Sequence, residues 1–325
     1  MDRKSLREYT HRAANSLIIS NNLYKQWVFR YTFLELEKDL GTKGDITTNV
    51  IFHKNRLATG RVIAKEDGVF AGREEIQYFL VDSDPAFRPG IKGKIELKFH
   101  VSDGANFKSG DLLFEISADV HDLLAVERTV LNLVMRMSAI ATLTRKMINL
   151  LDQHHCDVLI TPTRKTLWGL IDKKAVVIGG GGTHRLNLAD AILVKDTHLD
   201  LVNRDFGVVL QNIADANVEC RFVEIEVESI EETISVCRAF HEFLGTKIAA
   251  VGAVLLDNMT AEQTKYALDA VKSAGLYENI LFEASGGITE RNVLNYAKSG
   301  VDIISMGCLT SGIKGIDMSL KIRVE

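Results

Sequence analysis

The sequence predicts an α/β protein with two domains: an N-terminal α/β sandwich, in which helices cover an antiparallel sheet, and a C-terminal, incomplete α/β barrel of about seven strands. Two observations predict this class. From about residue 157 onward, short β-branched runs alternate with amphipathic stretches, which is typical of a parallel sheet. Between residues 50 and 120, apolar and polar residues alternate, which is typical of an antiparallel sheet with one covered face.

We expect three segments along the chain. Residues 1–135 form the N-terminal sandwich domain together with a helical extension, residues 136–312 form the barrel, and residues 313–325 form a tail that returns to the N-terminal domain. A long helical pattern from about Val120 to Asp152 joins the first domain to the barrel.

Each barrel strand is predicted from a short apolar run, and each later helix from its start and stop residues. The strands are expected at Asp157–Ile160, Ala175–Ile178, Ala191–Val194, Phe222–Val227, Ala249–Leu256, Ile280–Ala284 and Ile303–Met306. Helices are expected at Ser229–Phe243, Thr260–Ser273 and Thr289–Ser299, with Thr260 and Thr289 as N-caps. In the first domain, residues 12–38 are predicted to be helical, with a core-facing stripe of Leu23, Trp27, Tyr31 and Leu34.

Composition excludes several classes of protein. Apolar residues make up 46% of the 325 residues and charged residues 25%, as in a globular protein with a sizeable core. The net charge of −4 and the lack of a basic run interleaved with aromatic residues argue against nucleic-acid binding. No apolar stretch approaches the length of a membrane span, and the N-terminus lacks a secretion signal. We therefore expect a cytoplasmic protein with no membrane partner.

Three short clusters of positive charge lie between residues 163 and 198. The motifs TRKT, GGGGTHR and VKDTH contain Arg164, Lys165, His184, Arg185 and Lys195, and they follow predicted strands. Residues just after buried strands emerge at one rim of a sheet, so we expect these side chains to lie close together. Like charges held together repel unless an anion compensates them. The clusters therefore predict a pocket for a small polyanion.

Carboxylates and glycines are predicted at the same rim. Glu226 and Asp257 end neighbouring strands, where they can act as an acid/base pair, as metal ligands or as acceptors for sugar hydroxyls. The SGG run at Ser285, Gly286 and Gly287 follows a late strand, as Gly307 does, and barrels of the TIM-like type bind phosphate after their late strands. These residues predict a phosphate site.

Eight motifs, in order along the chain, resemble the nicotinate-nucleotide pyrophosphorylase (carboxylating) family, also called quinolinate phosphoribosyltransferases. They are DLGTKGDITT (39–48), ERTVLN (127–132), TRKT (163–166), GGGGTHR (179–185), VKDTH (194–198), VEIEVE (223–228), LLDNM (255–259) and EASGGI (283–288). The resemblance implies transfer of phosphoribose from phosphoribosyl pyrophosphate to quinolinate. The products would be nicotinate mononucleotide, pyrophosphate and carbon dioxide, in de novo NAD biosynthesis. Residues 136–312 would then be the phosphoribosyltransferase domain.

The resemblance also implies roles for individual residues. Quinolinate and the phosphates would be held by Arg128, Arg164, Lys165, His184, Arg185 and Lys195. Glu226 and Asp257 would meet the ribose hydroxyls and Mg²⁺, directly or through the substrate, and would act in catalysis with Lys165 and Lys195. Ser285, Gly286, Gly287 and Gly307 would bind the 5′-phosphate. The resemblance further implies a homodimer in which Arg128 reaches the partner's pocket, and assembly into a hexamer is left open.

Two alternatives remain open from the sequence. One is a barrel aldolase that uses Lys165 or Lys195 as a Schiff-base amine. The other is a protein of the same fold related to molybdate transport, or a non-catalytic binding module. An N-terminal extension of about 30 residues and an insertion at residues 82–93 lie outside the resemblance and carry no predicted function.

Overall fold

The chain divides into two compact units that exchange segments. In the computed structural model, which describes residues 1–85 and 88–324, the barrel unit comprises residues 1–13, 146–166 and 181–311. The sandwich unit comprises residues 14–145, 167–180 and 312–325. The expected boundary at 135/136 therefore falls inside a helix, and the first thirteen residues belong with the barrel instead of the sandwich. Ala86 and Phe87 of the insertion lie outside the described residues.

The sandwich unit is built on a four-stranded antiparallel sheet in the order β12-β1-β5-β3, as expected for residues 50–120. The strands are β1 (Leu57–Ala64), β3 (Glu96–Phe99), β5 (Leu112–Asp119) and β12 (Met318–Val324). Strand β12 lies in the expected tail and pairs with β1 from Ala58↔Val324 to Ala64↔Met318. A second, two-stranded sheet joins β2 (Gly68–Val69) to β4 (Asn106–Phe107).

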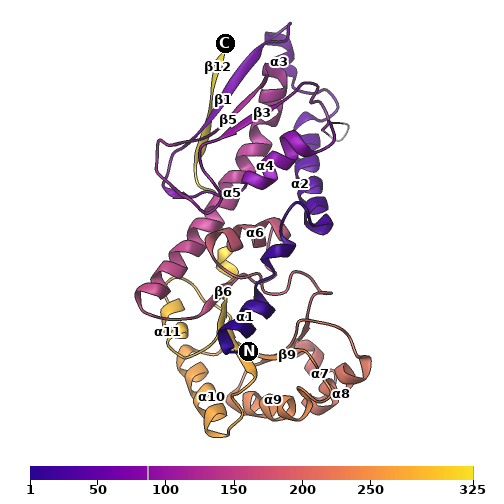
Figure 1. Ribbon diagram of the computed structural model, residues 1–325, viewed down its shortest axis with the longest axis vertical. Helices are drawn as coiled ribbons and strands as arrows, with labels where there is room; N and C mark the ends of the chain where they lie inside the picture. The colour runs from indigo at the N-terminus through magenta and orange to yellow at the C-terminus, as the bar shows by residue number, and fades with distance from the viewer. Residues whose placement is uncertain (86–87, 325) are drawn as a thin grey trace. The chain divides into compact units, whose positions relative to one another are not determined.

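Helices complete this unit. They are η1 (Ala14–Ser16), α2 (Asn22–Leu40), α3 (Ile46–Ile51), α4 (Arg73–Gln77), the π-helical turn η2 (Tyr78–Asp82), the long α5 (Val120–Gln153), which continues into the barrel unit, and α6 (Leu170–Gly179) (Figure 1). No helix among the described residues is both long enough and apolar enough to cross a membrane.

The predicted buried face of α2 is wrong. Leu23 and Leu34 are 50% and 59% exposed, whereas the buried stripe is Tyr24, Val28, Thr32 and Leu36. Apolar residues occur on more than one side of this helix, so spacing alone does not select the side that packs. The contacts that select it come from elsewhere in the chain: the Tyr24 hydroxyl donates a 2.6 Å hydrogen bond to buried Glu75.

The run Ala175–Ile178 is also not the strand that was predicted. It forms the second half of α6, in which Ala175 and Val176 are fully buried. Asp172 anchors the start of this helix, because its carboxylate accepts hydrogen bonds from the Leu167 and Trp168 N–H groups and from the Arg136 guanidinium. A four-residue apolar run does not distinguish a strand from a buried helical turn.

The barrel unit contains six parallel strands in the order β6-β11-β10-β9-β8-β7, so β6 and β7 form its two edges and the ring is incomplete. The strands are β6 (Leu159–Thr161), β7 (Ile192–Val194), β8 (Phe222–Val227), β9 (Val251–Asp257), β10 (Ile280–Ser285) and β11 (Ile303–Ser305). The helices are α1 (Arg3–His11), α7 (Asp196–Asp200), α8 (Phe206–Ala216), α9 (Ile230–Phe243), α10 (Ala261–Ser273) and α11 (Val293–Ala297), with the turn η4 (Gly307–Leu309). The predicted fold class is confirmed, with six strands in place of about seven.

Helices α8, α9, α10 and α11 follow one another around the outside of this sheet and contact their neighbours in turn (Figure 1). Thr260 caps α10 as predicted, and Ser229 caps α9; each accepts a hydrogen bond from a backbone N–H three residues later. Thr289 does not cap α11, which begins at Val293 after the N-cap Asn292. The loop after β10 is thus longer than predicted.

Candidate active site

A pocket of about 600 Å³ opens at the carboxyl ends of the barrel strands. Every strand of the parallel sheet contributes to it from its last residues or the loop that follows. The lining comprises Thr163, Arg164, Lys165, His184, Arg185, Leu193, Lys195, Glu226, Leu255, Asp257, Asn258, Glu283, Ser285, Gly286, Gly287, Ile288, Thr289, Ser305, Gly307, Cys308 and Ser311. In parallel α/β barrels this end carries the functional residues.

The predicted cations converge on this pocket. Arg164 and Lys165 follow β6, and Lys195 directly follows β7. Arg185 arrives by a different route from the one predicted, on the loop between α6 and β7. Arg185 is 4% exposed, and burial together with the neighbouring Arg164 lowers the pKa of its guanidinium. Two guanidinium groups facing the same cavity are a site for an anion.

Two carboxylates stand beside these cations at neighbouring strand ends. Glu226 is on β8, and Asp257 ends β9, which pairs in register with β8. Lys195 Nζ donates to Glu226 Oε2 at 2.9 Å. Burial and the nearby charge of Glu226 raise the pKa of Asp257, although Lys195 opposes the increase. The pair of carboxylates therefore forms a local concentration of negative charge that a divalent cation or sugar hydroxyl groups can relieve.

The glycine run after β10 lies against the loop after β9. Gly286 has φ +97°, and a Cβ at this position would come within 2.7 Å of the Asn258 backbone N. Asn258 N in turn donates a 2.9 Å hydrogen bond to Ser285 O. Only glycine allows this close approach of the two loops. Helix α11, which is five residues long and begins at Val293, does not start at this glycine run.

A second glycine brings β11 close to the TRKT loop. Gly307 lies so that a Cβ there would be 3.5 Å from Lys165 Cδ. The hydroxyl of Thr310 donates a 2.8 Å hydrogen bond to the Lys165 carbonyl and holds this loop in place. Ser285, Gly286, Gly287 and Gly307 thus line the same pocket as the cations, which is what their sequence positions predicted.

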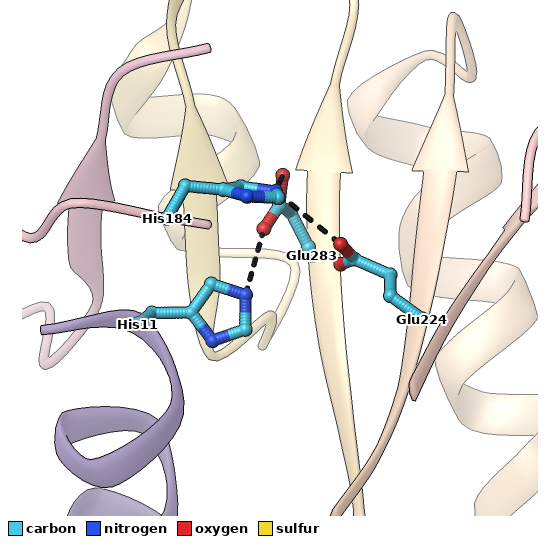
Figure 2. A group of neighbouring side chains, drawn as sticks. All are labelled: His11, His184, Glu224 and Glu283. Carbon is cyan, nitrogen blue, oxygen red and sulfur yellow. Dashed lines mark ion pairs between the residues drawn. The ribbon is translucent and has the colours of Figure 1, made fainter. Parts of the chain in front are cut away.

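A buried cluster of four ionisable groups lies under the pocket and includes His184. His184 Nε2 is 3.3 Å from both Glu224 Oε2 and Glu283 Oε1, and His11 Nε2 is 3.4 Å from Glu283 Oε2 (Figure 2). All four residues are buried. Burial opposes charge on His184, but Glu283 and Glu224 outweigh it and raise its pKa. Burial alone raises the pKa of Glu283, but His184 and His11 hold it well below its usual range.

This cluster offers four ligand atoms within 4.8 Å of one another, and a metal ion is therefore one possible occupant to test. The hydrogen bonds of His184 argue against one. The Arg185 backbone N–H donates to His184 Nδ1 at 2.6 Å, so the ring proton lies on Nε2, which faces the two carboxylates. A metal on Nε2 would require the proton on Nδ1, where Arg185 N–H already points.

Arg128 does not line the pocket. It lies on α5 in the sandwich unit, and its side chain is exposed. Thr197, in the VKDTH motif, is also exposed and outside the pocket lining, whereas Ser311 lines it.

Two models of one family match the chain. "Quinolinate phosphoribosyl transferase, N-terminal domain" matches residues 45–138, and "Quinolinate phosphoribosyl transferase, C-terminal domain" matches residues 140–321. The chain belongs to the quinolinate phosphoribosyl transferase family. The matched residues contain every predicted site residue.

Relatives in the quinolinate phosphoribosyl transferase family span nearly the whole chain. A probable nicotinate-nucleotide pyrophosphorylase (carboxylating) of Methanothermobacter thermautotrophicus is 36% identical over 290 residues, covering 89% of this chain and 96% of that protein. The mitochondrial quinolinate phosphoribosyltransferase (decarboxylating) 2a of Nicotiana tabacum is 33% identical over 298 residues, covering 90% and 81%. The solved nicotinate-nucleotide pyrophosphorylase of Francisella tularensis superimposes with a TM-score of 0.75 at 28% identity, covering 92% of this chain and 96% of that one.

Sequence reasoning missed two members of the buried cluster. Glu224 could have been found, since it lies two residues before Glu226 and alternate strand residues share a face. His11 carried no signal: it lies in the N-terminal extension, outside the residues matched by the quinolinate phosphoribosyl transferase models.

Proposed function

We propose that this protein transfers the phosphoribosyl group of phosphoribosyl pyrophosphate to the ring nitrogen of quinolinate, with release of pyrophosphate and carbon dioxide. The product is nicotinate mononucleotide, a precursor in de novo NAD biosynthesis. One observation carries the proposal: Arg164, Lys165, Arg185 and Lys195 converge on a single pocket that also holds two carboxylates and a glycine-rich loop. Family membership supports the same reaction.

Quinolinate is a planar dianion, and the arginines match it. A guanidinium presents two parallel N–H groups to a carboxylate, a geometry that an ammonium group cannot reproduce. Arg185 is buried at the pocket, and Arg164 is exposed beside it. Each guanidinium could therefore bind one of the two carboxylates of quinolinate. His184 supports this site from below, because both of its ring nitrogens already have partners in the protein.

Phosphoribosyl pyrophosphate fits the other side of the pocket. Ser285, Gly286, Gly287 and Gly307 would bind its 5′-phosphate, and Glu226 and Asp257 would accept hydrogen bonds from the ribose hydroxyls. The same two carboxylates fit Mg²⁺, which takes one or two carboxylates and substrate phosphates as ligands. When bound, the ion would help to neutralise the departing pyrophosphate.

The pyridine nitrogen carries a lone pair, so its attack on the sugar carbon needs no general base. Lys165 and Lys195 would neutralise the leaving pyrophosphate and so stabilise the transition state. Once ribosylated, the ring nitrogen is cationic. It then stabilises the carbanion left when the adjacent carboxylate departs as carbon dioxide, and a proton taken up from water at that carbon completes nicotinate mononucleotide.

The deciding experiment compares two acids. Purified protein, phosphoribosyl pyrophosphate and Mg²⁺ are incubated with quinolinate or with nicotinate, and the nucleotide product is measured. We expect turnover of quinolinate and little turnover of nicotinate, which lacks the second carboxylate. Equal turnover would contradict the double-carboxylate argument.

Borohydride trapping tests the aldolase alternative, and we expect no adduct because Lys195 is ion-paired with Glu226.

We also propose that two copies of the chain form a dimer in which Arg128 completes the partner's pocket. Its exposed position on α5 supports this arrangement. Arg128→Ala and Lys195→Ala should each lose activity, and mixing the two variants should restore part of it, because a mixed dimer contains one intact pocket. No recovery on mixing, with dimers confirmed by light scattering, would refute it.

A further inference from the structure

Helix α1 lies across the amino ends of the barrel strands, opposite the pocket. The arginines of α1 bind residues at the starts of strands. The Arg3 guanidinium donates to Asp302, directly before β11, at 2.9 Å and to the carbonyl of Ile280, the first residue of β10, at 2.7 Å. Arg7 donates to the Asp157 carbonyl at 2.6 Å. In return, Arg221 donates to the Thr10 carbonyl at 2.6 Å. The first eleven residues are therefore tied to the starts of β6, β8, β10 and β11.

The apolar side of α1 closes the base of the barrel. Leu6 packs against a buried cluster formed by Leu159, Ala253, Leu281 and Ile303 from four neighbouring strands. An apolar contact of this kind removes water from the barrel interior. Charged groups deeper inside are then shielded from the solvent below.

His11, the last residue of α1, extends into that interior. It is 0% exposed, and its ring stacks on Phe222 with centroids 4.4 Å apart. Nδ1 is 2.7 Å from Thr10 Oγ1, whose own hydrogen goes to the Leu6 carbonyl. The Thr10 oxygen is thus the acceptor and Nδ1 the donor. Nε2 faces Glu283 Oε2 at 3.4 Å and forms an ion pair with it when the ring carries a proton on both nitrogens (Figure 2).

The backbone of His11 holds the segment that leads to Arg185. Its carbonyl accepts hydrogen bonds from Thr183 N at 2.6 Å and from His184 N at 3.2 Å. A Cβ on Gly182 would come within 2.6 Å of the same carbonyl oxygen, so a side chain there would separate the two segments. Through side chain and backbone, His11 touches both Glu283 and the loop of His184.

We propose that His11 is a positioning residue for the pocket above it: by holding Glu283 and residues 182–184, it fixes His184 and the adjacent Arg185 where quinolinate binds. The inference depends on the proposed function for the identity of the ligand. The N-terminal extension would then be part of the substrate site, although it lies at the opposite end of the barrel and outside the family's matched residues.

The test measures KM for both substrates in His11→Phe, which keeps the ring stack but removes the nitrogen facing Glu283. The contact between His11 and Glu283 is fully buried, so we expect KM for quinolinate to increase roughly tenfold or more when it is lost, with KM for phosphoribosyl pyrophosphate within about twofold. His11→Gln, whose amide can donate to Glu283, should fall between. Val271→Ala, on the buried face of α10, is the control for general loss of stability and should leave both KM values unchanged.

Several outcomes would overturn the inference. Unchanged KM for quinolinate in folded His11→Phe would do so, as would equal increases for both substrates. If His11→Phe does not fold, the test uses His11→Gln instead. A wild-type KM for quinolinate in that variant would then contradict the positioning role of His11. Stoichiometric zinc in the wild-type protein that is lost in His11→Gln would make His11 a ligand instead. Absence of quinolinate turnover in the wild-type protein would overturn the proposed function first, and this inference with it.

Discussion

Lys195 and Glu226 form an ion pair of 2.9 Å inside the pocket, where the Lys195 side chain is 44% exposed and that of Glu226 only 8%. Without substrate, the cation and the carboxylate neutralise each other. In the proposed reaction, Glu226 would turn to the ribose hydroxyls and Lys195 to the pyrophosphate when substrate binds. The ion pair therefore holds both side chains in the pocket before an anion binds.

Lys195→Ala is expected to reduce kcat/KM for the transferase reaction by about 100-fold or more, because one preorganised charge on the leaving group is lost. Steady-state kinetics checks this. Lys265→Ala is the matched control, since Lys265 forms a surface pair with Asp269 outside the pocket and should have wild-type kinetics. A Lys195→Ala enzyme within a few-fold of wild type would remove this residue from the mechanism.

Arg185→Lys is expected to weaken quinolinate binding by roughly tenfold to a hundredfold, because lysine keeps the charge but loses the paired N–H donors. Isothermal titration calorimetry with quinolinate measures the loss directly. Arg238→Lys, at an exposed position on α9, should leave the dissociation constant unchanged. Equal affinity in both variants would show that Arg185 does not hold a carboxylate.

Gly286→Ala is expected to weaken binding of phosphoribosyl pyrophosphate, because the new methyl group would displace the Asn258 loop from the phosphate loop. Gly275→Ala provides a matched control: Gly275 also has a positive φ, +71°, but nothing lies within 4 Å of its would-be Cβ. Both variants carry similar backbone strain of about 1 kcal/mol, so only the contact differs. Comparable KM values for phosphoribosyl pyrophosphate in the two variants would contradict this account.

Glu75→Gln is expected to stabilise the protein at pH 8 and to change little at pH 4.5. Burial, with the charge of Asp103, raises the pKa of Glu75 from 4.5 to about 7, although the Tyr24 hydroxyl opposes this. The folded state therefore binds more protons than the unfolded state between these values, and stability falls as pH rises through them. Above pH 7 the ionised group costs roughly 3 kcal/mol, which glutamine removes.

Denaturant unfolding at the two pH values measures this difference. Exposed Glu242→Gln should show no pH-dependent gain. A gain in Glu75→Gln that is the same at pH 4.5 and pH 8 would show that the effect is not one of ionisation.

Residue order along the chain was enough to predict those parts of the molecule in which the local pattern agrees with the fold. Strands β8 to β11 and helices α9 and α10 follow from short buried runs, N-caps and terminal glycines. Lys195, Glu226, Asp257 and Ser285 were found because parallel strands end at one edge, so position along the chain predicts position in space.

Where the local pattern fits two structures equally well, contacts between residues distant in the sequence select one of them. Ala175–Ile178 became helical because Asp172 and Arg136 anchor α6 inside the sandwich unit, and α2 buries the stripe of Tyr24 because Glu75 lies opposite it. His11 meets residues 182–184 across 172 positions of sequence, and no periodicity reports such a contact. Side chains that are brought together only by folding leave no local signature, because the free energy that selects them comes from partners distant in the chain.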